Sequence, residues 1–266
     1  MFDDDYILSR IDETCDDLEI DNLPSGRLRP LNIEGVRGRI SDLDNPLINV
    51  VGLAKLSEET CEKTIRTVVE RYSLEKKSFA WLVGPTSKPG SLVKYLRAQG
   101  FKKVSDLSMS GLVMRNIEPE SDNDVRFPIR RVNWNEFGMN LDLITRAFGF
   151  GMDEEVAKLV VELYIASGEN SSAYFAYDPE TGKPVAFAAK VMDVSNHIVC
   201  LLGAGTLPEY RGKGIYQSLV LKRLKDAYEE GAHTAIMQAV KQTSAPICER
   251  MGFEVVCDID FYLPDI

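Results

Sequence analysis

The feature that most constrains the fold is an apolar run that leads through a glycine-rich loop into an amphipathic stretch. Residues 201–207 (LLGAGTL) form the run, Pro208 marks a turn, and residues 211–214 (RGKG) open the stretch. After them, apolar residues recur at helical spacing as far as Ala227. This order predicts a strand, a tight connection and the N-terminus of a helix. We therefore expect the layered α/β class, in which helices pack on a sheet.

The chemistry of the same loop suits a diphosphate. A helix N-terminus presents backbone N–H groups without intrahelical partners and a partial positive charge. Gly212 and Gly214 would let a phosphate approach the backbone, and Arg211 and Lys213 add positive charge. The loop lacks the G-K-[ST] of the P-loop and the G-x-G-x-x-G of dinucleotide-binding domains. The residues thus predict a diphosphate cradle of a different type.

The rest of the chain predicts two halves. Residues 116–124 (NIEPESDND) are polar and carry a proline, so we expect a linker there and domains at residues 1–119 and 120–266. In the first half the patterns predict strands at 47–53, 79–83 and near 103 and 112, and helices at 58–72 and 91–99. In the second half they predict strands at 125–132, 173–177, 184–192, 198–206, 234–238, 254–256 and 258–263, and helices at 134–148, 153–167, 214–230 and 245–251. Residues 177–184 (YDPETGKP) carry the signal of a hairpin.

The halves share a short pattern near their ends. Residues 95–104 (YLRAQGFKKV) are similar to residues 247–256 (ICERMGFEVV), and each reads as a short helix that ends in Gly-Phe before a strand. This repetition suggests that the halves arose by duplication.

The glycine-rich loop resembles the acyl-CoA-binding motif of the GNAT superfamily of N-acetyltransferases, R-x-x-G-x-G/A. Arg211 and Gly214 match the motif, whereas Tyr216 stands where the family usually has Gly or Ala. Residues 244–253 (SAPICERMGF) resemble the second signature of the family, a short helix that ends in Y-[EK]-[RK]-x-G-F. Cys248 occupies the place of the tyrosine in that signature.

The resemblance covers residues 125–263, and the whole chain is similar to tandem GNAT proteins with a degenerate N-terminal copy. It implies an α/β (α+β layered) fold of two GNAT-like domains, each a mixed, largely antiparallel sheet flanked by helices. It also implies an acyltransferase that moves an acetyl group from acetyl-CoA, or the acyl group of another acyl-CoA, to a primary amine of a small molecule, peptide or protein.

The resemblance further implies the cofactor-binding residues. Backbone N–H groups of residues 205–207 would polarise the thioester and hold the pantetheine arm. The full expected set is Gly205, Thr206, Leu207, Arg211, Gly212, Lys213, Gly214, Ile215, Tyr216 and Ser244.

The catalytic acid and base stay open at this stage. Residues 197–207 contain no carboxylate, so the strand before the cradle supplies no base. Base candidates are Glu154, Glu155, Asp193 and Asp260, and a relay of water molecules is the alternative. Candidate acids are Cys248, Tyr216 and Tyr262; Cys248 is alternatively a nucleophile or a small buried apolar residue.

The same departures leave a second function open. The absent strand carboxylate and the absent tyrosine favour a catalytically weak acyl-CoA-binding sensor or regulatory module. The cradle fits both functions, and an interaction domain without a cofactor would make it a coincidence.

The charge of the chain limits the kinds of partner that it is expected to bind. The net charge is −10, and residues 1–21 carry a large share of it, with Ile7, Ile11, Cys15 and Leu18 at helical spacing. We expect either a docking segment for a basic partner or an amphipathic helix that lies on the domain. The sequence pI of about 4.9 argues against a nucleic-acid ligand.

The remaining composition predicts a cytoplasmic protein. No apolar run has the roughly 18 residues of a membrane-spanning helix, and the first residues are acidic where a secretory signal is basic. The five cysteines and two histidines show no metal-ligand spacing, so free thiols and no metal site are expected. The oligomeric state is not predicted.

Overall fold

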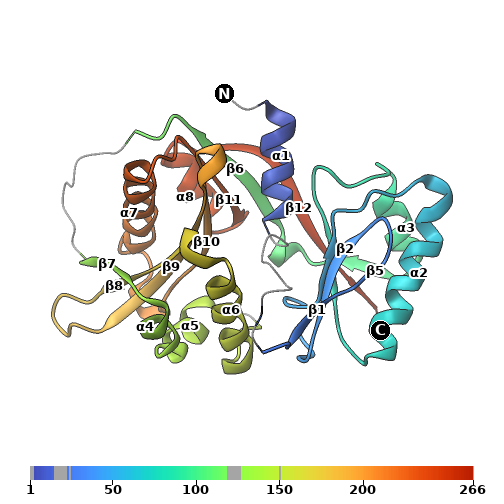
Figure 1. The fold of residues 1–266 in the computed structure, drawn as a ribbon, viewed down its shortest axis with the longest axis horizontal. Coiled ribbons are helices and arrows are strands. Elements are labelled where there is room, and N and C mark those ends of the chain that lie inside the picture. Colours follow the sequence, from blue (N-terminus) through green and yellow to red (C-terminus); the bar gives the residue numbers. More distant parts are fainter. Residues whose placement is uncertain (1–2, 15–22, 24, 119–126, 150, 266) are drawn as a thin grey trace. The chain divides into compact units, whose positions relative to one another are not determined.

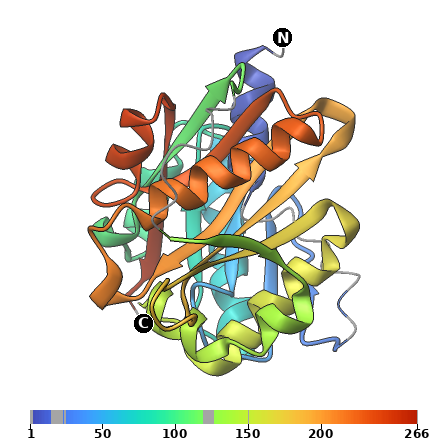
Figure 2. The same cartoon turned by 90° about the vertical axis from the view of Figure 1, so that its left-hand side faces the viewer.

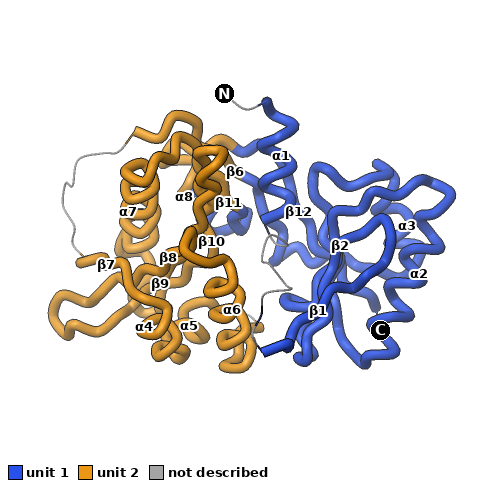
Figure 3. The backbone as a smooth tube through the Cα atoms, in the orientation of Figure 1, with its two compact units in different colours: residues 1–111, 238–246, 255–266 blue, residues 112–237, 247–254 orange. Residues whose placement is uncertain are grey.

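The computed structural model describes residues 3–14, 23, 25–118, 127–149 and 151–265. The chain forms two compact units, coloured separately in Figure 3: residues 1–111, 238–246 and 255–266 make unit 1, and residues 112–237 and 247–254 make unit 2. The strands β6 (Met109–Arg115), β11 (Thr234–Val240) and β12 (Glu254–Pro264) each have residues in both units. The predicted domain boundary at residues 119 and 120 lies outside the described residues, and it stays a prediction.

Unit 1 is a mixed sheet with helices packed on it (Figure 1). Its strands follow the order β1 (Leu28–Pro30), β2 (Arg37–Ser41), β3 (Val50–Gly52), β4 (Ala80–Val83) and β12, with β5 (Phe101–Lys103) also paired to β12. Only β3 and β4 of these pairs run parallel. The helices α2 (Glu58–Leu74) and α3 (Leu92–Ala98) contribute Ile65, Val68, Tyr72 and Leu96 to a core that also holds Trp81.

The helix α1 (Asp4–Glu13) confirms the amphipathic helix over the described part of the acidic segment. Ile7 and Ile11 are buried, and the backbone carbonyl of Ile11 accepts a hydrogen bond from Gln238 at 2.7 Å. Asp12 is also buried, and one carboxylate oxygen accepts from the Thr86 N–H at 3.0 Å and from its hydroxyl at 2.6 Å. The helix is therefore part of the packing of unit 1. Residues 15–22 of the predicted segment lie outside the described residues.

Unit 2 is a sheet with helices on both faces, and α7 (Ile215–Glu229) lies across its strands (Figure 2). The strand order is β11, β10 (Ile198–Thr206), β9 (Pro184–Asp193), β8 (Ser171–Tyr177) and β7 (Ile129–Val132). The other helices are α4 (Trp134–Gly138), α5 (Leu141–Phe148), α6 (Glu154–Ala166) and α8 (Ala245–Arg250). All pairs from β10 to β7 are antiparallel, and β10 runs parallel to β11.

Side chains of β9 show which helices cover which face. The Phe187 ring packs on Phe137 of α4 and Phe148 of α5, with ring centroids 5.8 and 6.4 Å apart. Lys190, three residues on, ion-pairs with Glu230 beside the end of α7 at 2.5 Å. Because successive strand residues point to opposite faces, α4 and α5 cover one face and α7 covers the other.

The fold class and most elements agree with the sequence predictions, with three corrections. The predicted helix at 134–148 is two helices, because Asn140 donates to the Glu136 carbonyl at 2.8 Å where α4 ends. The strand predicted at 47–53 begins only at Val50, since Asn45 holds residues 45–49 in a turn through its side chain and carbonyl. The two strands predicted after residue 254 form one strand, β12, which pairs with both β4 and β5. The hairpin at 177–184 is confirmed, with the Asp178 N–H donating to the Lys183 carbonyl.

Two observations concern the composition-based predictions. Within the described ranges, Cys61, Cys200, Cys248 and Cys257 are free thiols. No helix in the same ranges has the length and apolar character needed to cross a membrane.

Candidate functional site

The parallel strands β10 and β11 separate part of the way along their length. Their pairing covers only Ile198–Cys200 against Thr234–Ile236, although both strands are described in full and β10 continues to Thr206. From residue 201 onward, the edge of β10 that faced β11 no longer pairs with it. This edge ends at the glycine-rich loop.

A β-bulge changes the course of β10 within this stretch. Leu202 pairs with Ala189 of β9, but the next pair is Ala204 with Ala188, so Gly203 is an extra residue. Bulges bend a strand and are common beside active sites. A side chain at Gly203 has no room, because a Cβ there would lie 2.2 Å from the Tyr164 hydroxyl oxygen.

The bulge also decides which N–H groups of β10 face its free edge. Leu207 donates its N–H to the Val185 carbonyl of β9 at 3.0 Å. Orientations alternate in an antiparallel ladder, so Gly205 also faces β9, whereas Ala204 and Thr206 face the free edge. Of residues 205–207, which the sequence predicts to supply N–H donors to a thioester, Leu207 thus has its N–H bonded to β9, and the alternation turns the Gly205 N–H the same way. The role of this set in binding stays a prediction.

The glycine-rich loop places a bare helix end beside this edge. Gly212 and Gly214 have φ of +74° and +81°, in the left-handed region that favours glycine. Gly214 is the N-cap of α7 and supplies no side-chain cap. The first N–H groups of α7 are therefore not covered by a capping side chain. A Cβ at Gly212 would meet nothing within 4 Å, so the backbone there has open space beside it.

The two basic side chains of the loop are held by its surroundings. Arg211 donates from Nε to the Thr206 carbonyl at 3.0 Å and from Nη2 to the Ala147 carbonyl at 3.2 Å, which ties the end of β10 to the end of α5. Lys213 Nζ lies 4.6 Å from the centre of the Tyr210 ring. The Tyr210 hydroxyl donates to Asp178, and this bond is the main reason that the pKa of Asp178 lies below its ordinary value.

Tyr216 and Cys248 meet between α7 and α8. The Tyr216 hydroxyl oxygen is 3.5 Å from Cys248 Sγ, and Cys248 is fully buried. Burial raises the pKa of Cys248, while the Tyr216 hydrogen bond and the Arg223 charge oppose that shift. The side chain is therefore a thiol at neutral pH.

Residues 140–253 match the family model described as acetyltransferase (GNAT) family. This segment is a GNAT domain. Acyl transfer is the general activity of that family. No curated protein matches the chain in sequence.

Solved structures extend the likeness over most of the chain. A GCN5-related N-acetyltransferase from Kribbella flavida is 16% identical, with 94% of this chain and 93% of that chain covered and a TM-score of 0.68. A tandem GNAT protein from the clavulanic acid biosynthesis pathway is 12% identical over 86% of this chain and 77% of that one, with a TM-score of 0.60. A conserved protein of unknown function from Staphylococcus epidermidis is 17% identical over 95% and 97%, with a TM-score of 0.59. At these identities the likeness shows the fold alone.

Unit 1 also contains two parallel strands joined through a helix. There, however, other groups of the chain form hydrogen bonds with the backbone at the helix start and after the first strand. Along the chain, α2 lies between the parallel strands β3 and β4, as α7 lies between β10 and β11. At the start of α2, Ser57 and Thr60 form a capping box that engages the N–H groups of both residues. After β3, the Ala54 carbonyl accepts from the Lys88 N–H at 2.7 Å. The start of α2 is therefore capped by side chains, whereas the start of α7 is not.

Several candidate residues are engaged elsewhere. Asp260 ion-pairs with Lys103 in unit 1 at 2.7 Å, and this contact raises the pKa of Lys103. Tyr262 is buried in the core of unit 1. Ser244 directly precedes α8, in a segment of unit 1.

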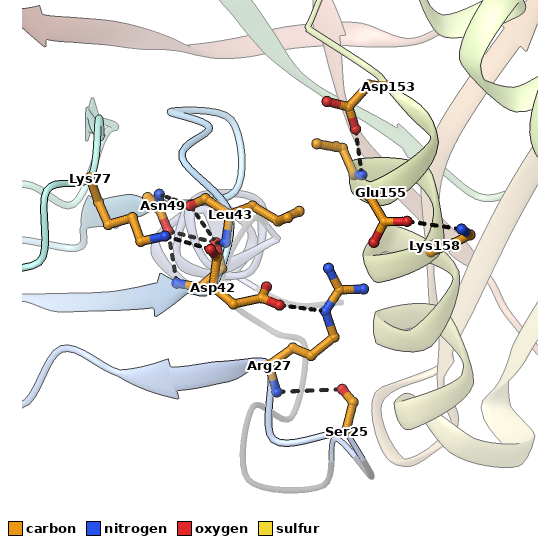
Figure 4. A network of polar contacts seen from close by, with 11 residues as sticks. Ser25, Arg27, Asp42, Leu43, Asn49, Lys77, Asp153, Glu155 and Lys158 are labelled. Atoms are coloured by element: carbon orange, nitrogen blue, oxygen red, sulfur yellow. Dashed lines mark hydrogen bonds and ion pairs between the residues drawn. The ribbon is translucent and has the colours of Figure 1, made fainter.

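The remaining base candidates have structural partners. Glu154 and Glu155 ion-pair with Lys158 at 2.8 and 2.9 Å, and their hydrogen bonds raise the pKa of Lys158 to about 12. Figure 4 shows the pair of Glu155 with Lys158. Asp193 caps the turn that connects β9 to the start of β10, where it accepts from Asn196. That turn is at the opposite end of β10 from the glycine-rich loop.

One residue near the site was not predicted from the sequence. Arg223 is buried on the inner side of α7, one turn after Leu219 and next to Leu224. A basic residue on the apolar face of an amphipathic helix is a sequence signal that could have identified it.

Proposed function

We propose that this chain transfers an acyl group, acetyl first among the candidates, from acyl-CoA to a primary amine. The observation that carries the proposal is the bare N-terminus of α7 beside the edge of β10 that has left β11. The N–H groups of residues 212–216 and the charge of Lys213 suit the diphosphate of CoA. The free N–H groups of Ala204 and Thr206 suit an extended pantetheine arm.

When bound, acyl-CoA supplies the thioester that the amine attacks, and the CoA thiol is released. We assign the Ala204 or Thr206 N–H to the carbonyl oxygen of that thioester, where negative charge develops. The Tyr216 hydroxyl is assigned as the proton donor to the sulfur, with Cys248 as its hydrogen-bond neighbour. A buried thiol that stays protonated is a poor nucleophile, so an acyl-cysteine is not part of the proposal.

We assign no side chain as the base. Glu154, Glu155 and Asp260 are held in ion pairs, and Asp193 belongs to the opposite end of β10. The amine therefore loses its proton to water in this proposal.

Calorimetric titration with acetyl-CoA and with CoA tests the cradle. The informative variant is Gly212→Asp, which places a carboxylate where the diphosphate would bind. Gly100→Asp is the matched control, because Gly100 also has a positive φ (+85°) and a Cβ there would meet nothing within 4 Å, but it lies in unit 1. We expect micromolar binding by the natural chain and by Gly100→Asp, and at least tenfold weaker binding by Gly212→Asp. Equal affinities would refute the cradle.

The second candidate, an acyl-CoA sensor with little activity, is favoured by Tyr216 and Cys248 in place of the usual small residue and tyrosine. Thiol release from acetyl-CoA with a panel of primary amines separates the two functions. Turnover that falls at least tenfold in Tyr216→Phe, with unchanged CoA affinity, supports the enzyme and the acid role. Tight binding without turnover on any amine or lysine peptide supports the sensor.

A further inference from the structure

Arg223 of α7 is a buried cation whose hydrogen bonds all go to backbone carbonyls. Its side chain is fully enclosed, with 1% of its surface exposed. Nε donates to the Leu219 carbonyl at 3.0 Å, within the helix. Nη1 donates to two carbonyls of the sheet, those of Ala189 at 2.8 Å and Leu202 at 3.1 Å.

This arrangement is unusual in its lack of a counter-charge. In the described ranges no carboxylate forms an ion pair with Arg223, and its Nη2 atom has no hydrogen-bond partner. The neighbouring buried cation Lys190, by contrast, is paired with Glu230. A buried charge without a carboxylate is costly, so a residue that serves stability alone would be better replaced by an apolar side chain.

The two sheet carbonyls that Arg223 binds belong to the last pair before the bulge. Leu202 and Ala189 are opposite each other, and Gly203 follows as the extra residue. In β9, the Val185 carbonyl faces β10, where it accepts from the Leu207 N–H at 3.0 Å. Without the extra residue, Thr206 would stand opposite Val185 and would turn its N–H into the β9 ladder.

We propose that Arg223 is a positioning residue that holds the bulge, and thereby turns the Ala204 and Thr206 N–H groups toward the free edge of β10. Its guanidinium donates to the Leu202 and Ala189 carbonyls, which belong to the last pair before the register shifts by one residue. The consequence for acyl-CoA rests on the proposed function, whereas the consequence for the orientation of these N–H groups does not.

Amide hydrogen exchange of the natural chain tests the orientation directly. Without ligand, the Ala204 and Thr206 amides are expected to exchange faster than those of Gly205 and Leu207, which bond to β9. On addition of CoA, the Ala204 and Thr206 amides should become protected. Slow exchange of Ala204 and Thr206 in the absence of CoA would overturn the register and with it the proposal.

Three variants then test the role of Arg223. Arg223→Met removes the donors at similar volume, and Arg223→Lys retains one donor. Lys222→Met is the matched control on the same helix, because its ammonium group forms an ion pair with Asp226 of α7. We expect Arg223→Met to weaken CoA binding at least tenfold and to change amide exchange along residues 202–206. Arg223→Lys should recover part of the affinity, and Lys222→Met should match the natural chain.

The outcomes separate this inference from the proposed function. A folded Arg223→Met with unchanged CoA affinity and unchanged exchange in β10 refutes the positioning role. If the natural chain binds no CoA, the proposed function fails, and the exchange pattern of β10 still decides the role of Arg223. If Arg223→Met does not fold, exchange in the natural chain and in Arg223→Lys carries the test, and Arg223→Lys must then change exchange only near the bulge.

Discussion

A methyl group at position 203 tests the geometry of the bulge most directly. In Gly203→Ala, the new Cβ would lie 2.2 Å from the Tyr164 hydroxyl oxygen, and the next nearest atom is the ring carbon Cζ at 3.4 Å. The contact is thus with one atom. Tyr164 is largely buried and its ring stacks on Trp134 at 5.7 Å, so it has little freedom to move away.

The expected loss of stability in Gly203→Ala follows from that single contact. Relief requires a shift of about one ångström in a packed interior, and overpacking of this kind costs about 1–3 kcal/mol. Tyr164→Phe removes the clashing oxygen and leaves only contacts of ordinary van der Waals length. Gly203→Ala should therefore destabilise the natural chain by about 2 kcal/mol and have an effect below about 0.5 kcal/mol in the Tyr164→Phe background.

Urea denaturation of the four proteins in this double-mutant cycle gives the coupling energy, provided that the m values agree. Tryptophan fluorescence is a suitable signal because Trp134 contacts Tyr164. Gly138→Ala is the control, since a Cβ there meets only Val161, at 3.7 Å. Equal costs of Gly203→Ala in both backgrounds would refute the reasoning, because the clash would then not involve the hydroxyl.

Three further predictions concern buried polar groups. Asp12→Ala leaves the N–H and the hydroxyl of Thr86 without their acceptor. It should lower the free energy of unfolding, measured by urea denaturation, by about 1–3 kcal/mol. An unchanged free energy would mean that water replaces the carboxylate. The hydrogen bond from Tyr210 lowers the pKa of Asp178. The stability that this bond gives to the folded protein is therefore complete above the ordinary carboxyl pKa, and it is lost as the pH falls through the lowered pKa. The stability difference between Asp178→Asn and the natural chain should therefore shrink below about pH 4 in urea titrations, and a pH-independent difference would contradict this linkage. Cys248 should react with iodoacetamide at pH 8 far more slowly in the folded than in the unfolded protein, as followed by mass spectrometry, and equal rates would show that its thiol is accessible.

Local patterns determined most of the elements. The strand before the glycine-rich loop was predicted with its observed bounds, Ile198–Thr206, and α7 begins directly after Gly214. The helices predicted at 58–72 and 153–167 are α2 and α6, and Ser57 and Asp153 cap them. These features depend on residues that are neighbours in the chain, so the sequence is sufficient to predict them.

Contacts between distant segments decided the details of the site. The sequence shows Gly203 as one of several glycines, and only the pairing of β10 with β9 makes it a bulge that faces Tyr164. Arg211 has the expected position, yet its side chain binds the Thr206 and Ala147 carbonyls. The Leu207 N–H likewise bonds to the Val185 carbonyl of β9, because the alternation of β10 is reset at the bulge.

The sequence by itself therefore determined the likeness of residues 140–253 to the GNAT family, the layered fold and the glycine-rich loop, because each is encoded in short patterns of residue type and spacing. The tertiary structure decided which backbone N–H groups face the edge that β11 has left, where β10 leaves β11, and that Arg223 binds the carbonyls before the bulge. Register between strands far apart in the chain is set by the sum of many contacts across the sheet. A shift of one residue reverses every donor along an edge, and no local pattern records that choice.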